Sequence, residues 1–425
     1  MSFVPLAPIY GYVVGTDEAK KRPATNRELQ RMCELVIEGM AAGGCGISAQ
    51  ILGVEGNMQL DHDGTPMVTD TMSERDLTAF SQAMGSLGRG VAQVTGNMDF
   101  AEIMARASGR PVIWNALMAE GSLNQHGGAR MTPKAAIERL KNLNEVEGVR
   151  IYAQAHTCNF ASQFTFEDYN LADAIPCWKE ACMGTLEEKI VKFSDPVRRR
   201  ALKESHEQRG GLFGAGYVLN DIKVAWIPLD VPNGAEMQAK YEGYTIGEIA
   251  ERESRHPLDV MLDISVASRL KNGFETKMIL TSPQAMREIA TSSMALPGIS
   301  DGGAHTKFVT TARFPTELLG YWVREHKIMS FEEAHWRLSA YPAGAAGLRN
   351  RGYLAEGLPA DIIVYDPVSL DSLRPERVWD YPAGEWRLIQ KAKGYSHIIV
   401  NGEVTFIDGV CTGATPGRLL RHGVA

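Results

Sequence analysis

The chain has 425 residues, enough for a large domain and a smaller module, and its 44% apolar and 22% charged content is ordinary for a globular protein. A net charge of −7 argues against attraction to nucleic acid or to an anionic membrane, and the only compact basic run, Arg198 to Arg200, is interpreted as a solvated helix face. The sequence shows no leader and no apolar stretch of about 18 residues or more, and its six cysteines fit neither a zinc ribbon nor a disulfide scaffold, so we expect a reduced, cytoplasmic protein.

Short apolar runs alternate with helical patterns over the first 160 residues. The expected strands are residues 7–14, 45–51, 90–95, 111–115 and 149–155, and the expected helices are residues 27–42, 73–87, 100–108 and 133–144. Such alternation, with strands that are apolar on both faces, predicts an α/β fold built from parallel βαβ units. A barrel and a doubly wound sheet both fit, but no Gly-x-Gly-x-x-Gly follows a strand at the right place for a dinucleotide fold.

Residues 160–275 are charged, aromatic and irregular, with helical patches at 186–203 and 245–270. We expect them to form an insertion over the mouth of the sheet or barrel, as a lid or a specificity element. Strands are expected to return at 278–280 and 296–300.

The remaining chain is expected to be helical at first and then β-structured. Two helices are expected between residues 317 and 338, the second beginning with a capping box of Ser330 and Glu333. From residue 352 onward, short strands alternate with Asn-Gly and Asp-Gly pairs at positions 401 and 408, which predict hairpins.

The strongest local signal for chemistry is the run from Gly298 to His305, in which a strand leads into Asp301 and a pair of glycines. In a (β/α) barrel the carboxyl ends of the strands form the active-site face, where an Asp can bind a metal and accept a proton from metal-bound water. An Asp that caps a helix in a Gly-rich turn is an equally good interpretation.

Four further polar residues near strand ends are candidates for substrate binding, namely Gln93, Asn115, His156 and His305. Gln93 and Asn115 can hydrogen-bond an amide substrate, or they can form a buried polar layer. His156 can stabilise an oxyanion or be a structural loop histidine. His305 can orient a substrate or pack against the following helix.

Other motifs are weaker candidates for a functional site. Asp61-His62-Asp63 resembles a metal cluster, but it lies in a loop rich in Gly and Asn, where a solvated turn is the better interpretation. The sequence has no Gly-x-Ser-x-Gly elbow, no His-Glu-x-x-His and no phosphate loop, so a covalent serine mechanism has no support.

Four stretches of the C-terminal part form one pattern. They are Ser300-Asp301-Gly302, the run from Phe314 to Arg324 with Ser330 to Ala334, the run from Leu348 to Gly357 with Ala360-Asp361 and Asp366-Pro367, and Val400-Asn401-Gly402. This pattern resembles the amidohydrolase superfamily, and within it the N-acyl-D-amino-acid deacylase branch (amidohydrolase family 3). Weaker similarity covers residues 5–160, and residues 160–275 resemble the family least.

The resemblance implies an incomplete TIM-type (β/α) barrel, strands 3 to 8, in residues 1–350, followed by a small C-terminal β-sandwich module in residues 351–425. In that family, zinc is held by a His-x-His pair, by later Cys and His ligands and by a last-strand Asp, which Asp301 matches. The present sequence has no His-x-His, and Asn115 stands near a position where the family has a histidine. Asn is a weak zinc ligand, so we expect one zinc ion in a site that this chain leaves incomplete.

The expected function is metal-dependent hydrolysis of an amide C–N bond in a small N-acyl amino acid or cyclic amide, with Asp301 as general base and then acid on a metal-bound water. The alternative is a catalytically incomplete chain, either truncated or one subunit of a split amidohydrolase. Because an open parallel sheet exposes its edges, we expect a homo-oligomer or a partner chain that completes the barrel, and neither nucleic acid nor membrane as a partner.

Overall fold

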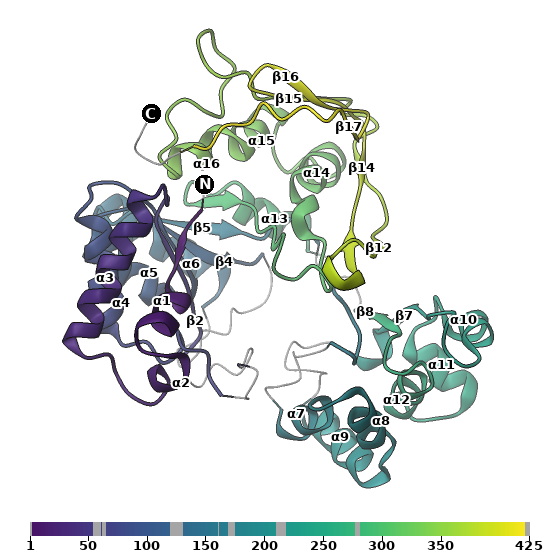
Figure 1. Cartoon of the computed structure of the whole chain (residues 1–425). Coiled ribbons are helices and arrows are strands. Elements are labelled where there is room, and N and C mark those ends of the chain that lie inside the picture. The colour runs from purple at the N-terminus through teal and green to yellow at the C-terminus, as the bar shows by residue number, and fades with distance from the viewer. Residues whose placement is uncertain are drawn as a thin grey trace.

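The computed structural model describes residues 2–53, 61, 65–119, 131–159, 161–168, 175–209, 218–276 and 281–420. Its main element is a six-stranded sheet in the order β1-β2-β3-β4-β5-β9 (Figure 1). The strands are β1 (Val4–Pro5), β2 (Ile47–Ile51), β3 (Ala92–Gly96), β4 (Val112–Leu117), β5 (Ile151–Ala155) and β9 (Ala295–Pro297). Every neighbouring pair is parallel, so the predicted α/β fold with parallel βαβ units is confirmed.

Helices that connect the strands or follow the last of them pack on one face of this sheet and form the larger hydrophobic core. They include α3 (Asn26–Ala41), α4 (Glu74–Gly85), α5 (Met98–Ser108), α6 (Pro133–Lys141), α13 (Pro283–Ala290) and α15 (Phe331–Leu338). Alternate strand residues such as Ile47, Val94 and Trp114 are buried in this core, whereas Gln93 and Asn115, on the other face, are half-buried. The strands were expected to be apolar on both faces. The structure contradicts this, because the face away from the helices carries polar side chains.

The first predicted strand, residues 7–14, is wrong. Only Val4–Pro5 pair with β2, and the chain then forms the helix α1 (Leu6–Val13). An apolar run of this length fits a strand or a helix, and its buried residues Leu6, Ile9 and Tyr10 have helical spacing. The strand expected at 278–280 falls outside the described residues.

The described residues between 163 and 276 form a second unit with its own core, and they are more regular than the sequence indicated. The unit contains β6 (Gln163–Phe164), β7 (Lys223–Trp226), β8 (Gly273–Glu275), α7 (Pro176–Cys182), α8 (Leu186–Ser194), α9 (Pro196–Arg209), α10 (Gly234–Tyr241), α11 (Ile246–Glu253) and α12 (Pro257–Ala267). Its three strands form a separate antiparallel sheet in the order β6-β8-β7. Phe166 is central to its core, with Trp178 stacked at 6.0 Å and Phe193 at 5.0 Å between ring centroids.

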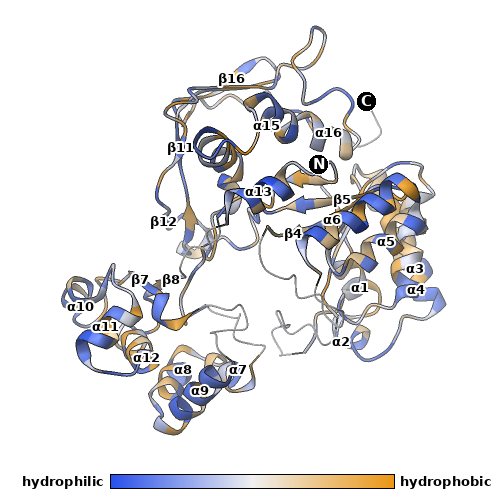
Figure 2. Cartoon of the chain, turned by 180° about the vertical axis from the view of Figure 1, so that it is seen from behind, coloured by the Kyte–Doolittle hydropathy of each residue, from blue (hydrophilic) through white to orange (hydrophobic). Residues whose placement is uncertain are grey.

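The basic run at Arg198 lies on α9, which is largely hydrophilic (Figure 2). Arg198 pairs with Asp195 at 2.7 Å and with Glu180 at 3.0 Å. Arg199 pairs with Asp263 at 2.7 Å. The run is thus a helix face engaged in ion pairs.

The C-terminal part consists of short antiparallel strands. A four-stranded sheet contains β10 (Ile362–Tyr365), β15 (Tyr395–Val400), β16 (Glu403–Ile407) and β17 (Val410–Cys411), while β11 (Asp371–Ser372) pairs with β14 (Ala392–Lys393) and β12 (Glu376–Val378) pairs with β13 (Arg387–Ile389). The hairpin turns predicted at Asn401-Gly402 and Asp408-Gly409 are confirmed, with positive φ at all four residues.

Ser330 caps α15 through Glu333 N at 3.1 Å, but the Glu333 carboxylate pairs with Arg337 at 2.9 Å instead of completing the predicted capping box. Among the helices of the described residues, none has both the length and the apolar character needed to span a membrane.

Candidate active site

Asp301 stands at the end of the parallel sheet, after β9. Gly298 N donates to Ala155 O at 2.9 Å, which extends the pairing of β5 and β9 beyond the strand. Asp301 has a left-handed backbone, with φ 44°, and its carbonyl accepts hydrogen bonds from Ala304 N at 3.1 Å and His305 N at 3.4 Å. The main chain therefore closes this turn, and the carboxylate accepts no hydrogen bond from the described residues. Capping of a helix is not the role that the structure gives to this side chain.

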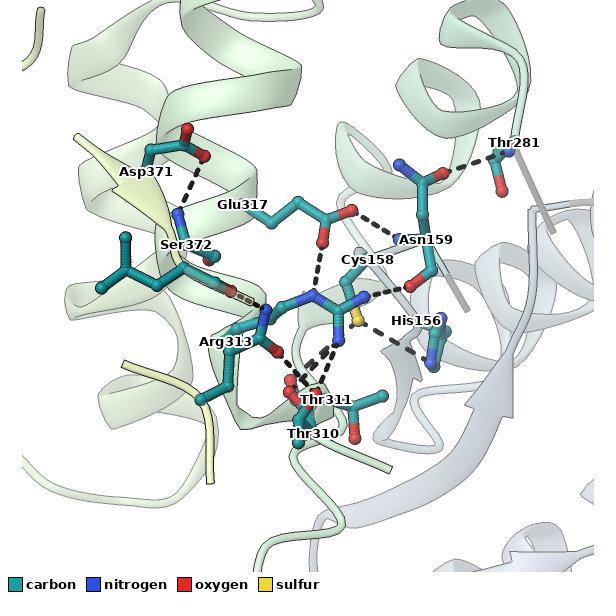
Figure 3. Close-up of polar contacts among 12 residues, drawn as sticks. His156, Cys158, Asn159, Thr281, Thr310, Thr311, Arg313, Glu317, Asp371 and Ser372 are labelled. Atoms are coloured by element: carbon teal, nitrogen blue, oxygen red, sulfur yellow. Dashed lines mark hydrogen bonds and ion pairs between the residues drawn. The ribbon is translucent and has the colours of Figure 1, made fainter. Parts of the chain in front are cut away.

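His156 and Cys158 follow β5 at the same edge of the sheet (Figure 3). His156 N donates to Leu117 O at 2.9 Å. Burial lowers the pKa of the His156 imidazole, although the negative charge of Asp301 raises it in part. The Sγ of Cys158 lies 3.9 Å from His156 Nε2, and burial raises the pKa of the thiol to about 12. At neutral pH the pair is therefore a neutral imidazole beside a protonated thiol.

This lowered pKa predicts a pH dependence of stability. Because the folded protein favours the neutral imidazole, His156 contributes stability above its ordinary pKa of 6.5, and that stability is lost as pH falls through the folded-state pKa. Over that window the free energy of unfolding should fall by up to ~1.4 kcal/mol per pH unit. Denaturant unfolding of the wild type and His156→Gln at several pH values between neutral and mildly acidic will measure this, and equal slopes in both proteins would contradict the prediction.

Gln93 and Asn115 are joined through Thr95. Gln93 Nε2 and Asn115 Nδ2 both donate to Thr95 Oγ1, at 3.1 and 3.2 Å. The Oδ1 atom of Asn115 and the Oγ1 atom of Thr157 are buried and have no partner among the described residues. Since buried polar atoms are nearly always hydrogen-bonded, this edge of the sheet has acceptors available for a bound molecule.

Sequence analysis did not identify a group of hydrogen-bonded residues near the site, which centres on Arg313 and Glu317 (Figure 3). Arg313 Nε lies 2.8 Å from Glu317 Oε2, and both side chains are about one-tenth exposed. Asn159 N donates to Glu317 Oε1 at 2.5 Å, and Arg313 also donates to Asn159 O. Burial raises the pKa of Glu317, and Arg313 lowers it in part. Thr311 Oγ1 donates to Ser300 O at 2.7 Å, which ties this group to the residue before Asp301.

His305 lies in the loop that follows Asp301. Its ring is half-buried and lies 6.4 Å from the ring of Phe308, between centroids. Phe308 N and Val309 N donate to its carbonyl at 2.8 and 3.0 Å. The residue thus contacts its own loop rather than a following helix, and the structure does not bring its ring into contact with the other predicted site residues.

The described residues do not form a metal site by themselves. Across the described ranges, no three His, Cys, Asp or Glu side chains converge in a way that could hold a metal ion. Asp301 offers an unpartnered carboxylate, and the neutral form of His156 that burial favours is the form that binds metals. Asp61 pairs with Lys20 at 2.5 Å, while His62 and Asp63 lie outside the described residues.

Comparison with solved structures defines the class of fold. A crystal structure of D-aminoacylase, described as defining a subset of amidohydrolases, matches 96% of this chain and 68% of its own, with a TM-score of 0.55 and 17% identity. N-acyl-D-glutamate deacylase from Bordetella bronchiseptica, complexed with zinc and a phosphonate inhibitor, matches 95% of this chain and 68% of its own, with a TM-score of 0.53 and 18% identity. The chain thus has an amidohydrolase-like α/β fold.

Curated relatives narrow the likeness to one branch. N-acyl-D-glutamate deacylase of Alcaligenes xylosoxydans xylosoxydans is 35% identical over 107 residues, which are 25% of this chain and 20% of the relative. D-aminoacylase of the same organism is 24% identical over 185 residues, which are 43% of this chain and 35% of the relative. No family model matches. The chain therefore spans between a fifth and about a third of these relatives, and its predicted similarity to D-aminoacylase-like amidohydrolases is confirmed.

Proposed function

We propose that the chain hydrolyses the amide C–N bond of a small N-acyl amino acid or cyclic amide. The observation that carries the proposal is Asp301, an unpartnered carboxylate at the carboxyl edge of a parallel sheet. In α/β folds this edge is where catalytic residues lie. The deacylase relatives support the type of bond, because removal of an acyl group from an amino-acid nitrogen is hydrolysis of an amide.

In the proposed reaction Asp301 acts first as general base and then as general acid. It takes a proton from the attacking water and returns it to the leaving nitrogen. His156, kept neutral by burial, donates a hydrogen bond to the carbonyl oxygen as negative charge develops there. Asn115 accepts a hydrogen bond from the substrate through its unpartnered Oδ1. Gln93 and His305 contact the remainder of the substrate.

A single zinc ion fits this proposal in part. When bound, such an ion lowers the pKa of water and polarises the carbonyl. Asp301 is the donor that the described residues offer for it. The remaining donors are proposed to come from outside the described residues or from another chain.

The six-stranded sheet is proposed to be strands 3 to 8 of a TIM-type barrel within residues 1–350, with residues 160–275 as a lid and residues 351–425 as part of a C-terminal β-sandwich. Among the described strands, β1 and β9 each pair on one side only. Parallel edges of this kind take up further strands readily. A second copy or a partner chain that completes the barrel is therefore part of the proposal, and a chain inactive on its own is its alternative.

The test combines metal analysis with an amide-hydrolysis assay on the full chain. The purified protein, alone and with any co-purifying protein, is analysed for zinc and offered N-acyl-D-amino acids, N-acyl-L-amino acids and cyclic amides. We expect stoichiometric zinc in the purified protein. We also expect the release of amine or ring-opened acid to increase with the zinc content. Zinc and turnover only in the presence of a second protein would support the split enzyme. Absence of turnover in every combination, including zinc-loaded protein, would overturn the proposed function.

A further inference from the structure

The loop that carries Asp301 is held from both sides by segments far away in the sequence. We call residues 301–313 the Asp301 loop. On one side, Gln163 N of β6 donates to Phe308 O at 2.7 Å. On the other side, Leu388 N of β13 donates to Thr306 O at 2.8 Å. The loop is thus bonded both to the 163–276 unit and to the C-terminal hairpin β12–β13.

Lys307 joins the same three segments through its side chain. Its Nζ lies 2.8 Å from Asp168 Oδ2 in the 163–276 unit and 2.7 Å from Glu385 Oε2 in the hairpin. The ammonium also lies 5.2 Å from the centre of the Trp386 ring. With a side chain only 23% exposed, Lys307 is more strongly bound here than a typical surface lysine.

Arg377 of β12 fastens the hairpin to the 163–276 unit. Its guanidinium lies between two indole rings, 4.0 Å from the centre of Trp226 in β7 and 3.7 Å from the centre of Trp386. Burial lowers the pKa of Arg377 to about 10, and the charges of Glu167 and Asp168 oppose that shift. No ion pair to a described carboxylate accompanies this side chain, so the two aromatic faces are its main partners.

A glycine makes this stacking possible. A Cβ added at Gly273, the first residue of β8, would lie 3.0 Å from Arg377 Nη2. A larger residue at this position would require the Arg377 guanidinium to shift. Three segments of the chain therefore meet around one cation with little space to spare.

We propose that Arg377, Lys307, Trp226 and Trp386 form a clasp that positions Asp301. In this arrangement the C-terminal hairpin holds the Asp301 loop and the 163–276 unit in a fixed relation, so that the proposed lid cannot shift without moving the catalytic carboxylate. Arg377 and Lys307 are then positioning residues, since they act through the loop. The functional part of this inference rests on the proposed role of Asp301, whereas the mechanical part does not.

The test is hydrogen exchange of the full chain with Arg377→Gln, which removes the cation but keeps a shorter, uncharged polar side chain. We expect exchange about tenfold faster in peptides that cover 301–313 and 163–168, with exchange in β3 to β5 unchanged. Arg387→Gln is the matched control, because Arg387 lies on the same hairpin but pairs with Asp380 at 2.7 Å, outside the clasp. Unchanged exchange in the 301–313 peptides of Arg377→Gln would overturn the clasp.

Two further variants guard against a general loss of structure. Trp226→Phe keeps an aromatic face over Arg377 and should retain slow exchange, whereas exchange in Trp226→Ala should be faster. If both variants behave alike, the stacking plays no part and the clasp is wrong. In an active assembly Arg377→Gln should lower kcat by about tenfold with a smaller change in KM. If exchange is slow in the wild type and faster in Arg377→Gln, the clasp is supported even when neither protein shows turnover. The absence of turnover would then reject the proposed function alone.

Discussion

Replacing Asp301 with Asn should reduce turnover by about 10²–10⁴-fold in any active assembly, the range typical of a lost general acid or base. The amide cannot take a proton from water, and it is a poor donor to a cation. KM should change much less, because the substrate contacts are assigned to other side chains. Steady-state kinetics on an N-acyl amino acid will measure both values.

Asn is the right substitution at this position because of the backbone. Asp301 has φ 44°, a left-handed conformation that Asn adopts more easily than most other residues with a side chain. Asp408→Asn is the matched control, since Asp408 has φ 48° and lies in an exposed hairpin turn. Turnover of Asp301→Asn within a few-fold of the wild type would exclude the assigned role. An equal loss in Asp408→Asn would point to a backbone effect instead.

Much of the fold around Asp301 could be predicted, because its strands and helices carry strong local signals. The helix predicted at 27–42 is α3, which begins after a complete capping box at Thr25 and Glu28. The strand predicted at 7–14 is wrong, since a short apolar run fits either a strand or a helix until its tertiary contacts are known. In the structure, the hydroxyl of Tyr10 donates to the buried Asp76 at 2.8 Å, a contact that the helix makes possible.

Of the candidate site, only the residues that follow directly after strands could be predicted from the sequence. Asp301 and His156 each come shortly after a strand, and parallel strands end at one edge, so their proximity was foreseeable. The bond from Asn159 N to Glu317 joins residues 158 positions apart, and nothing in the local sequence indicates it. The ion pair of Arg313 and Glu317 has i,i+4 spacing, which suggests an ordinary surface pair. Only the packing of other segments over it makes it buried.

Because this ion pair is buried, we expect Arg313→Met to cause a large loss of stability. Removing the guanidinium leaves the Glu317 carboxylate in a low-dielectric site, with Asn159 as its remaining hydrogen-bond partner among the described residues. Breaking a buried pair from one side typically costs about 3–5 kcal/mol. Chemical denaturation at neutral pH should show a loss of that size. Arg31→Met is a suitable comparison, because its ion pair with Glu34 at 3.1 Å is exposed.

The double variant Arg313→Met, Glu317→Leu should recover most of that loss, because it leaves no charge behind. The pH dependence gives an independent check. Burial already raises the pKa of Glu317 above its usual 4.5, so the folded state favours the protonated form. Without Arg313 this pKa rises further, and stability should be lost progressively as pH increases from 4.5 through the folded-state pKa. The deficit of Arg313→Met should therefore shrink on acidification toward pH 4.5. A deficit that stays constant over that range, or a double variant no more stable than the single one, would show that the cost comes from lost packing of the arginine stem and not from a stranded carboxylate.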